Sequence, residues 1–154
     1  MDILNTNESS IGRWISILYR YRQNFLSKRL DFYNIGSGQH MFLLALAKNN
    51  RISQEELSDY LKIDKATTAK AIKKLEVEGY VARDVDVADK RAYQVFLTAK
   101  GFEVLPVIQA AVKEWERHIT ADLLESESAL VEEILGKMAR NAWQCKMGIQ
   151  TDNK

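Results

Sequence analysis

Cysteine, proline and long apolar runs are scarce in this chain of 154 residues, which has one cysteine and one proline. A single cysteine cannot close a disulfide within the chain, and this favours a reducing compartment. No apolar run approaches the roughly 18 residues that a membrane-spanning helix needs. The N-terminal residues MDILNTNESS have neither the basic nor the apolar part of a signal peptide. We therefore expect a cytoplasmic protein in which Cys145 is an incidental or interface thiol.

Residue patterns that support catalysis or metal binding are absent as well. The sequence has no Gly-rich phosphate loop, no nucleophile elbow and no histidine placed to support a nucleophile. Its two histidines, His40 and His118, are far apart, and no close group of Cys, His, Asp or Glu has the spacing of metal ligands. The sequence therefore predicts no enzyme, no metal site and no cofactor.

The charged residues are unevenly distributed, although the net charge is only +1. Residues 65–74 contain four lysines and no acid, whereas residues 98–154 contain nine acids and seven bases. Positive charge that is concentrated in one short segment is typical of a protein that binds nucleic acid. The alternative is that these lysines only solvate an exposed helix face.

Apolar residues recur at helical spacing over most of the chain and predict six helices. We expect them at about residues 10–30, 37–48, 53–61, 65–78, 98–119 and 126–145. Four of them begin at a residue whose side chain can cap the first turn: Ser37, Ser53, Asp64 and Thr98. Ser53 and Glu56 have the spacing of a capping box. Gly79 is expected to end the fourth helix, and Pro106 to kink the fifth helix or delay its start.

Two β-prone runs, Tyr80–Arg83 and Tyr93–Leu97, follow the fourth helix and flank a charged tip. Such runs around a short polar connection predict a β-hairpin. A pair of helices on a tight turn followed by a hairpin is a winged helix-turn-helix, which usually binds duplex DNA. The predicted fold is therefore mainly α with a small β-hairpin wing, and residues 37–98 are expected to form a winged helix-turn-helix DNA-binding domain.

The helices before and after this domain, in residues 1–36 and 99–154, have wide apolar stripes and no separate core to join. A second copy of the chain could bury these stripes, and two-fold dimers are the commonest oligomers. We therefore expect the two segments to form the helical dimerisation region of a homodimer. The alternative is that they pack onto their own domain.

The fourth helix has two different faces when it is projected at 100° per residue. Thr68, Ile72 and Leu75 fall together and are expected to face the core. The rest of the helix offers lysines, a hydroxyl group and small side chains, which can contact bases or phosphates in a major groove. We predict that residues near the helix start contact bases: Lys65, Ala66, Thr67 and Lys70. Lys73 and Lys74 are predicted to contact phosphate.

The predicted wing tip has two acids, Asp86 and Asp89, beside two bases, Lys90 and Arg91. Free acids would repel DNA, so we expect the two aspartates to stabilise the wing by bonding turn amides or by pairing with Arg83 or Arg91. An arginine held in this way can enter a narrow A·T-rich minor groove. We predict that Arg91 enters the minor groove and that Lys90 lies near phosphate. The alternative is a simple charged turn.

Residues 63–101 read IDKATTAKAIKKLEVEGYVARDVDVADKRAYQVFLTAKG, and this segment resembles the MarR (multiple-antibiotic-resistance regulator) family of bacterial transcription factors. The similarity comprises the recognition helix, a Leu-Glu-x-x-Gly turn, an Asp-x-x-Asp-Lys-Arg wing and a closing Leu-Thr-x-x-Gly. Thr68 departs from the family pattern, which more often has an aliphatic residue there. The resemblance implies a homodimeric, sequence-specific regulator on an inverted-repeat operator. Such a regulator is usually a repressor that a small ligand or oxidation releases.

The resemblance also implies a small-molecule effector site near the first, second and fifth helices. Five aromatic or polar residues fall in that neighbourhood: Trp14, Arg20, Tyr21, Tyr33 and His40. They would suit an aromatic carboxylate or a phenolic compound, although each could instead belong to the core or to an interface. Redox-sensing members of the family have a reactive cysteine in the first helix, and this chain has none there.

A winged helix that contacts only other proteins is the alternative function. Such a protein–protein interaction module, without specific DNA binding, would have an apolar or acidic recognition face. The lysines in residues 65–74 favour duplex DNA as the partner.

Overall fold

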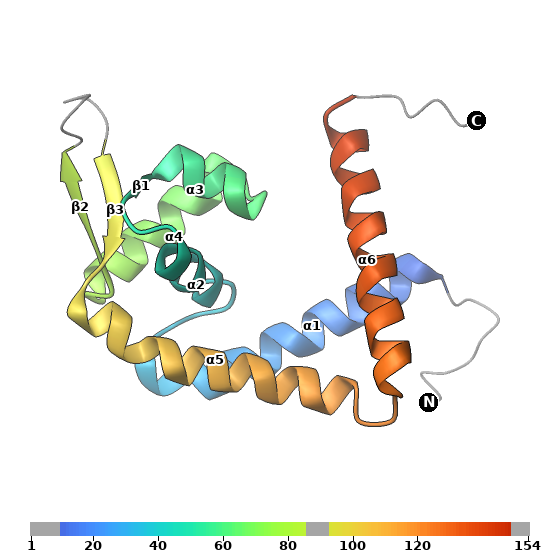
Figure 1. Ribbon diagram of the computed structural model, residues 1–154. Helices are drawn as coiled ribbons and strands as arrows, with labels where there is room; N and C mark the ends of the chain where they lie inside the picture. Colours follow the sequence, from blue (N-terminus) through green and yellow to red (C-terminus); the bar gives the residue numbers. More distant parts are fainter. Residues whose placement is uncertain (1–9, 86–92, 149–154) are drawn as a thin grey trace. The chain divides into compact units, whose positions relative to one another are not determined.

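The computed structural model describes residues 10–85 and 93–148. The chain forms two compact units, Met1–Trp115 and Glu116–Lys154. In chain order, the helices and strands are α1 (Ile11–Leu30), the short 3-10 helix η2 (Asp31–Tyr33), α2 (His40–Lys48), β1 (Ile52–Ser53), α3 (Gln54–Leu61), α4 (Lys65–Val77), β2 (Val81–Val85), β3 (Tyr93–Leu97), α5 (Ala99–Ile119) and α6 (Glu125–Lys146) (Figure 1). The predicted fold class, mainly α with a small β wing, is confirmed.

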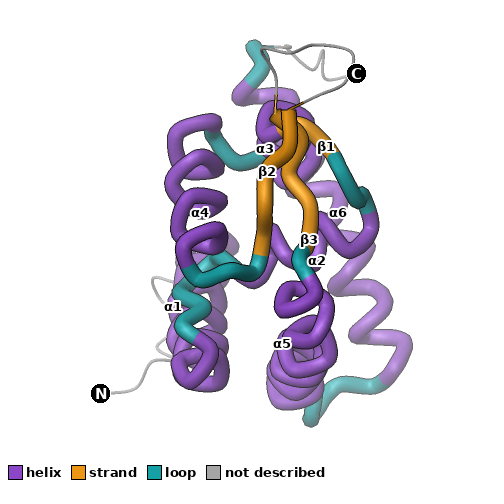
Figure 2. The backbone as a smooth tube through the Cα atoms, turned by 90° about the vertical axis from the view of Figure 1, so that its left-hand side faces the viewer, coloured by secondary structure: helices purple, strands orange, loops and turns teal. Residues whose placement is uncertain are grey.

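The three strands form one antiparallel sheet in the order β1-β3-β2. β2 and β3 are the predicted hairpin, with Arg83 opposite Val95. The sequence does not predict β1, because its two residues, Ile52 and Ser53, are too few to show a period. Ile52 lies opposite Val95 on the other side of β3. β2 runs beside α4, so the wing and the predicted recognition helix are neighbours (Figure 2).

The core of the first unit joins helices from both ends of the domain to the winged helix. Leu26 and Leu30 of α1, together with Val104 and Ile108 of α5, are buried in the same apolar cluster as Ile72 of α4. These two helices therefore share a core with the winged helix, contrary to the expectation that they have none to join. The reason is that the apolar stripe of α1 is long, so its C-terminal half packs here while its N-terminal half stays exposed.

Most of the predicted helix ends are confirmed. Ser53 and Glu56 form the capping box: Ser53 Oγ accepts from Glu56 N at 3.1 Å, and Glu56 Oε2 accepts from Ser53 N at 2.8 Å. Asp64 caps α4 by accepting from Thr67 N at 2.8 Å. Gly79, just beyond α4, has a φ of +79°, which lies in the left-handed region that glycine tolerates.

The structure contradicts two expected helix starts, whereas the kink expected as the alternative at Pro106 stays a prediction. Ser37 does not cap α2, because its hydroxyl donates to Gln23 Oε1 of α1 at 2.8 Å and α2 begins later. Gly38, with a φ of +78°, turns the backbone between Ser37 and the helix. Pro106 does not delay α5, whose start lies well before it and which continues through it. Pro106 is exposed, so water can donate to the helix carbonyl that the proline leaves without a partner.

The wing meets α5 at a close contact around Gly101. Thr98 caps α5 as predicted: its Oγ1 accepts from Gly101 N at 3.1 Å and donates to Gly79 O at 2.6 Å. Thr98 N also donates to Tyr80 O at 3.1 Å. A Cβ added at Gly101 would lie 2.2 Å from this Tyr80 oxygen, so only glycine fits there. This close packing explains why the Leu-Thr-x-x-Gly sequence ends in glycine at Gly101.

The second unit consists of the end of α5 and of α6, and much of its apolar surface is uncovered. The exposed apolar residues include Ile119, Leu123, Leu124, Leu130, Val131, Ile134 and Leu135. Several of them line a groove of about 660 Å³ between the two helices. Exposed apolar surface of this kind is typical of interaction sites, and the dimer stays a prediction. Within residues 10–85 and 93–148, no helix combines the length and the apolar character needed to span a membrane.

Candidate nucleic-acid interface

A tight turn joins α3 to α4 and fixes how the two helices meet. Lys62 has a φ of +57°, in the left-handed region that few residues other than glycine adopt. Ile63 N donates to Ser58 O at 3.1 Å, and the Ser58 hydroxyl donates to Ile63 O at 2.5 Å. Ser58 is buried, so these bonds satisfy polar groups that water cannot reach. The two helices and their turn form a helix-turn-helix.

α4 has the two faces that the sequence predicts. Thr68, Ile72 and Leu75 are fully buried. The predicted contact residues are all exposed: Lys65, Ala66, Thr67, Lys70, Lys73 and Lys74. α4 therefore presents a lysine-rich exposed surface, and the assignment of individual residues to bases or phosphates stays a prediction.

Asp64 orients the side chain of Thr67 in addition to capping the helix. The Asp64 carboxylate accepts from the Thr67 hydroxyl at 2.7 Å and from Thr67 N at 2.8 Å. These bonds, the hydroxyl bond first, hold the pKa of Asp64 below its usual value. Because the hydroxyl proton goes to Asp64, Thr67 offers DNA an acceptor and a methyl group. Thr67 can therefore accept from adenine N6 or cytosine N4, or touch a thymine methyl.

Two of the predicted contact lysines already have neighbours within the protein. Lys65 forms an ion pair with Glu55 of α3, and the hydrogen bond from Lys65 to Glu55 raises the pKa of Lys65. Lys74 extends toward the loop after η2. Its Nζ would lie 3.4 Å from a Cβ added at Gly36 in that loop. Lys74 also lines the cavities on the α1 and α2 side of the helix. Its ammonium group is thus turned away from the wing.

Arg83 ties the wing to α4. Its Nε donates to Glu76 Oε1 at 3.0 Å, and its Nη2 donates to Glu76 Oε2 at 2.5 Å. This bidentate pair raises the pKa of Arg83, chiefly through the hydrogen bond to Glu76. Arg83 therefore links the wing to α4 through a partner that the sequence does not predict, and its role in stabilising the wing stays a prediction. Four predicted wing residues lie outside the described residues: Asp86, Asp89, Lys90 and Arg91.

A second arginine packs on the other face of the same sheet. The guanidinium of Arg51 lies 4.3 Å from the centre of the Phe96 ring. Its Nη1 pairs with Asp84 Oδ2 at 2.9 Å. Asp84 follows Arg83 in β2, so the two side chains point to opposite faces of the sheet. Arg51 therefore braces the loop before β1 against the outer face of the wing.

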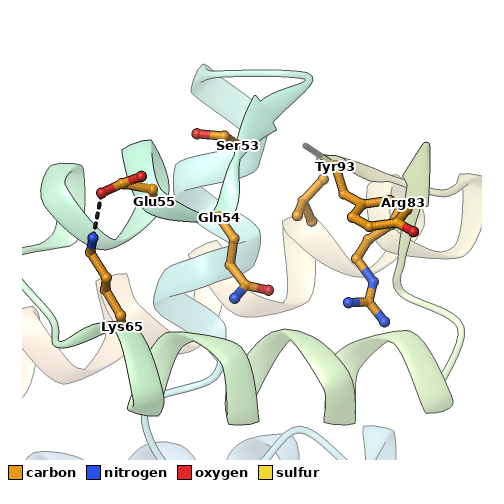
Figure 3. Close-up of a pocket in the computed structure, with 7 residues that line it drawn as sticks. Ser53, Gln54, Glu55, Lys65, Arg83 and Tyr93 are labelled. Atoms are coloured by element: carbon orange, nitrogen blue, oxygen red, sulfur yellow. Dashed lines mark hydrogen bonds and ion pairs between the residues drawn. The ribbon is translucent and has the colours of Figure 1, made fainter. Parts of the chain in front are cut away.

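A groove of about 430 Å³ lies between the start of α3, α4 and the inner face of the wing, and we call it the wing groove. Its lining residues are Ser53, Gln54, Glu55, Lys65, Arg83, Tyr93 and Val95 (Figure 3). The side chains of Gln54 and Arg83 point toward α4 from two sides. Sequence reasoning missed Gln54 and Tyr93. Strand alternation places Tyr93 on the face of Val95, but no sequence signal shows which helix that face meets.

The five predicted effector residues lie in different environments. On α1, Trp14 is half-buried and Arg20 and Tyr21 are exposed. Tyr33 is half-buried, and His40 is buried. None of the five lines the cavity of about 550 Å³ between α1, α2 and α4. That cavity is lined by Tyr19, Gln23, Ser37, Gly38, Gln39, Met41, Phe42, Ile63, Thr67, Lys70, Ala71 and Lys74.

His40 has the chemistry of a core residue. It is 1% exposed, and its Nε2 has no hydrogen-bond partner within the described part of the chain. Burial, and secondarily the positive charge of Arg22, lower the pKa of His40 to about 4. The imidazole is therefore neutral at physiological pH. Among the described residues, no group of three or more His, Cys, Asp or Glu side chains could hold a metal ion.

A helix-turn-helix, a hairpin beside its second helix and a lysine-rich exposed face together define a winged helix-turn-helix protein of the DNA-binding kind. A model of the MarR family matches residues 33–92. The chain is 31% identical to the HTH-type transcriptional regulator BilQ of Clostridioides difficile (strain CD3), over 82% of this chain and 86% of that protein. The chain belongs to the MarR family.

Solved structures agree with this assignment over nearly the whole chain. A MarR transcriptional regulator from Methanosarcina mazei Go1 has a TM-score of 0.81 and 44% identity, over 88% of this chain and 97% of that one. A MarR family transcriptional regulator from Listeria monocytogenes, complexed with 26mer DNA, has a TM-score of 0.82 and 26% identity, over 94% of this chain and 99% of that one. The protein is therefore a DNA-binding transcriptional regulator and not an enzyme.

Proposed function

We propose that this regulator is a homodimer that binds an inverted-repeat operator and releases it when a small aromatic ligand binds. The observation that carries the proposal is the set of exposed lysines on α4, a helix that contacts strand β2 of the wing. On this proposal the start of α4 enters the major groove. Thr67 and Lys70 then reach base edges, Lys73 contacts phosphate, and Arg91 enters the neighbouring minor groove.

Exposed apolar surface supports the dimer. In the first unit, Ile11, Ile15 and Leu18 of α1 are 63%, 42% and 44% exposed. In the second unit, Leu130 and Ile134 of α6 are 54% and 45% exposed. A second copy of the chain, related by a two-fold axis, would cover these surfaces and would present two recognition helices to the two halves of a palindrome.

Sedimentation equilibrium tests the dimer. We expect the wild-type chain to sediment with twice its monomer mass of 17.7 kDa. Ile134→Asp should shift the chain toward the monomer, because it places a charge in the apolar surface. Lys137→Gln, at an exposed position of the same helix whose side chain pairs with Glu133, is the matched control and should leave the mass unchanged. A wild-type monomer at micromolar concentration would contradict the proposal.

The cavity between α1, α2 and α4 supports the ligand response. Tyr19 and Phe42 give it aromatic walls, and Lys70 and Lys74 give it cations, which suit an aromatic carboxylate. Lys70 belongs both to this cavity and to the face proposed to read DNA, so a bound carboxylate would take a cation from the operator. Benzoate should therefore weaken operator binding by the wild type and have less effect on Tyr19→Ala. Equal effects on both proteins would contradict this assignment.

Selection of bound duplexes from a random library tests the operator reading. We expect enrichment of an inverted repeat by the wild type, and loss of that enrichment in Arg91→Ala and Lys70→Ala. Lys137→Gln should select the same repeat as the wild type. If no motif emerges and binding vanishes at moderate salt, the chain has only electrostatic affinity for DNA. The protein-interaction reading of the winged helix would then replace the operator proposal.

A further inference from the structure

We propose that the wing groove holds a phosphodiester of the DNA backbone, and that Arg83 is its cationic contact, with Gln54 and Tyr93 as polar neighbours. This inference rests on the proposed DNA-binding function and adds contacts that the lysine face and the wing tip do not supply. Arg83 then has two partners: Glu76, which fixes its orientation, and the phosphate.

The topology of duplex DNA places a backbone strand at this position. The major and minor grooves are separated by a sugar–phosphate strand. A protein whose helix lies in the major groove and whose wing reaches the adjacent minor groove must straddle that strand. In this fold, the space between α4 and the inner face of the wing is the wing groove (Figure 3). The strand therefore passes along the groove if α4 and the wing bind as proposed.

The residues around the groove suit a phosphate. Gln54 approaches from the start of α3 and Arg83 from β2, so donors face the groove from two elements. Tyr93 lies on the same strand face as Val95; in the hairpin register, Tyr93 is opposite Val85 and Val95 is opposite Arg83. Amide, phenol and guanidinium groups are the side chains that usually donate to phosphate oxygens.

Arg83 is oriented for a further contact. A guanidinium has five N–H donors, and Glu76 accepts from two of them, one on Nε and one on Nη2. The Arg83 side chain remains 39% exposed, so the guanidinium keeps an edge open to solvent. Because Glu76 holds the plane of the group, little rotational freedom is left to lose when a phosphate binds.

The acids at the groove do not prevent this binding. Glu76 is paired with Arg83, and Glu55 is paired with Lys65. The Glu55 and Lys65 side chains are 66% and 71% exposed, and such exposed pairs are weak and exchange readily. Lys65 therefore stays near Glu55 and offsets its charge beside the phosphate, while water screens this exposed pair. The less exposed Arg83–Glu76 pair carries its phosphate contact as a unit.

The salt dependence of DNA binding by the full-length protein tests the proposal. Each phosphate contact contributes about 0.9 to the slope of log K against log salt concentration. We expect Arg83→Gln to flatten the slope by about 0.9 on a fixed duplex between about 50 and 200 mM salt, and to weaken binding. Arg83→Lys keeps the charge and should keep the slope.

Two further variants separate contact with DNA from structural support. Glu76→Gln removes the partner of Arg83 but no phosphate contact, so it should leave the slope at least as steep as in the wild type. Arg51→Gln removes an ion-paired arginine from the outer face of the same sheet and is the matched control, with no expected change of slope. Circular dichroism melts of each variant show whether it is folded at the temperature of the titration.

The outcomes distinguish this inference from the proposed function. If the wild type selects an operator but Arg83→Gln keeps the full slope, the groove does not hold phosphate and the function stands. Equal flattening by Glu76→Gln or Arg51→Gln would also overturn the inference, because the effect would then come from a disturbed wing. If the wild type binds no duplex, both proposals fail.

Discussion

Replacing Gly101 by alanine is expected to lower the free energy of unfolding by about 2 kcal/mol, since overpacking a filled site typically costs about 1–3 kcal/mol. The new Cβ would lie 2.2 Å from Tyr80 O, 3.1 Å from Leu97 Cδ2 and 3.3 Å from Leu97 Cβ. The first contact involves backbone, so either α5 or the start of β2 must move. Movement of Tyr80 O also weakens its hydrogen bond from Thr98 N, which is 3.1 Å long.

Within a helix, alanine is otherwise more stabilising than glycine by about 0.5–1 kcal/mol. The sign of the change in unfolding free energy therefore shows whether the steric clash or the helix preference dominates. Gly136→Ala in α6 is the control, because its Cβ would meet only the end of the Arg140 side chain, at 3.5 Å. Urea unfolding at one fixed protein concentration should show a loss for Gly101→Ala and a gain for Gly136→Ala. For a chain of this size, a loss of 2 kcal/mol lowers Tm by roughly 4–8 °C. A gain in stability for Gly101→Ala would refute the packing argument at the joint between wing and α5.

Three further predictions concern single side chains. The pKa of His40 is about 4 in the folded chain and 6.5 for the free side chain, so the unfolded chain takes up the proton first as pH falls. The free energy of unfolding therefore decreases between about pH 6.5 and about pH 4, by up to about 1.4 kcal/mol per pH unit. Urea midpoints at pH 7 and 5 should converge in His40→Gln but not in the control His118→Gln. Thr68 is fully buried and its hydroxyl has no partner among the described residues, so Thr68→Val should raise the free energy of unfolding by about 1 kcal/mol; a loss would show that the hydroxyl is satisfied. Lys73→Ala should weaken binding equally on all duplexes and flatten the salt slope by about 0.9, and a change of sequence preference would contradict a phosphate role.

Features that depend on neighbours along the chain are predictable from this sequence. The two faces of α4 follow from a period of 3.6 residues, and the buried Thr68 and Ile72 confirm them. The Ser53 and Asp64 caps depend on residues three positions away, and both are confirmed. Such local features can be predicted because helix geometry fixes the distances between residues three or four positions apart.

Features that depend on distant segments are not predictable in this way. Ser37 has a capping residue's chemistry, but a hydrogen bond to Gln23 competes for its hydroxyl. Arg83 is only one of the partners that the sequence offers to the wing aspartates, and the structure pairs it with Glu76 of α4. The wing groove likewise exists only because α3, α4 and β2 meet. The sequence alone does not show which charged residues pair, because several residues of suitable charge lie within the same stretch. The fold determines which of them meet.

In the proposed complex, two chains read two half-sites from one face of the duplex. The most direct test compares the affinity of the protein for its selected inverted repeat with the affinity for the same repeat carrying five extra base pairs at its centre. Half-sites read by a two-fold dimer lie about 10 base pairs apart, so the insertion turns one half-site to the far side of the duplex. We expect the affinity to fall toward that of a random duplex. An unchanged affinity would contradict the account, because each chain would then bind its half-site independently.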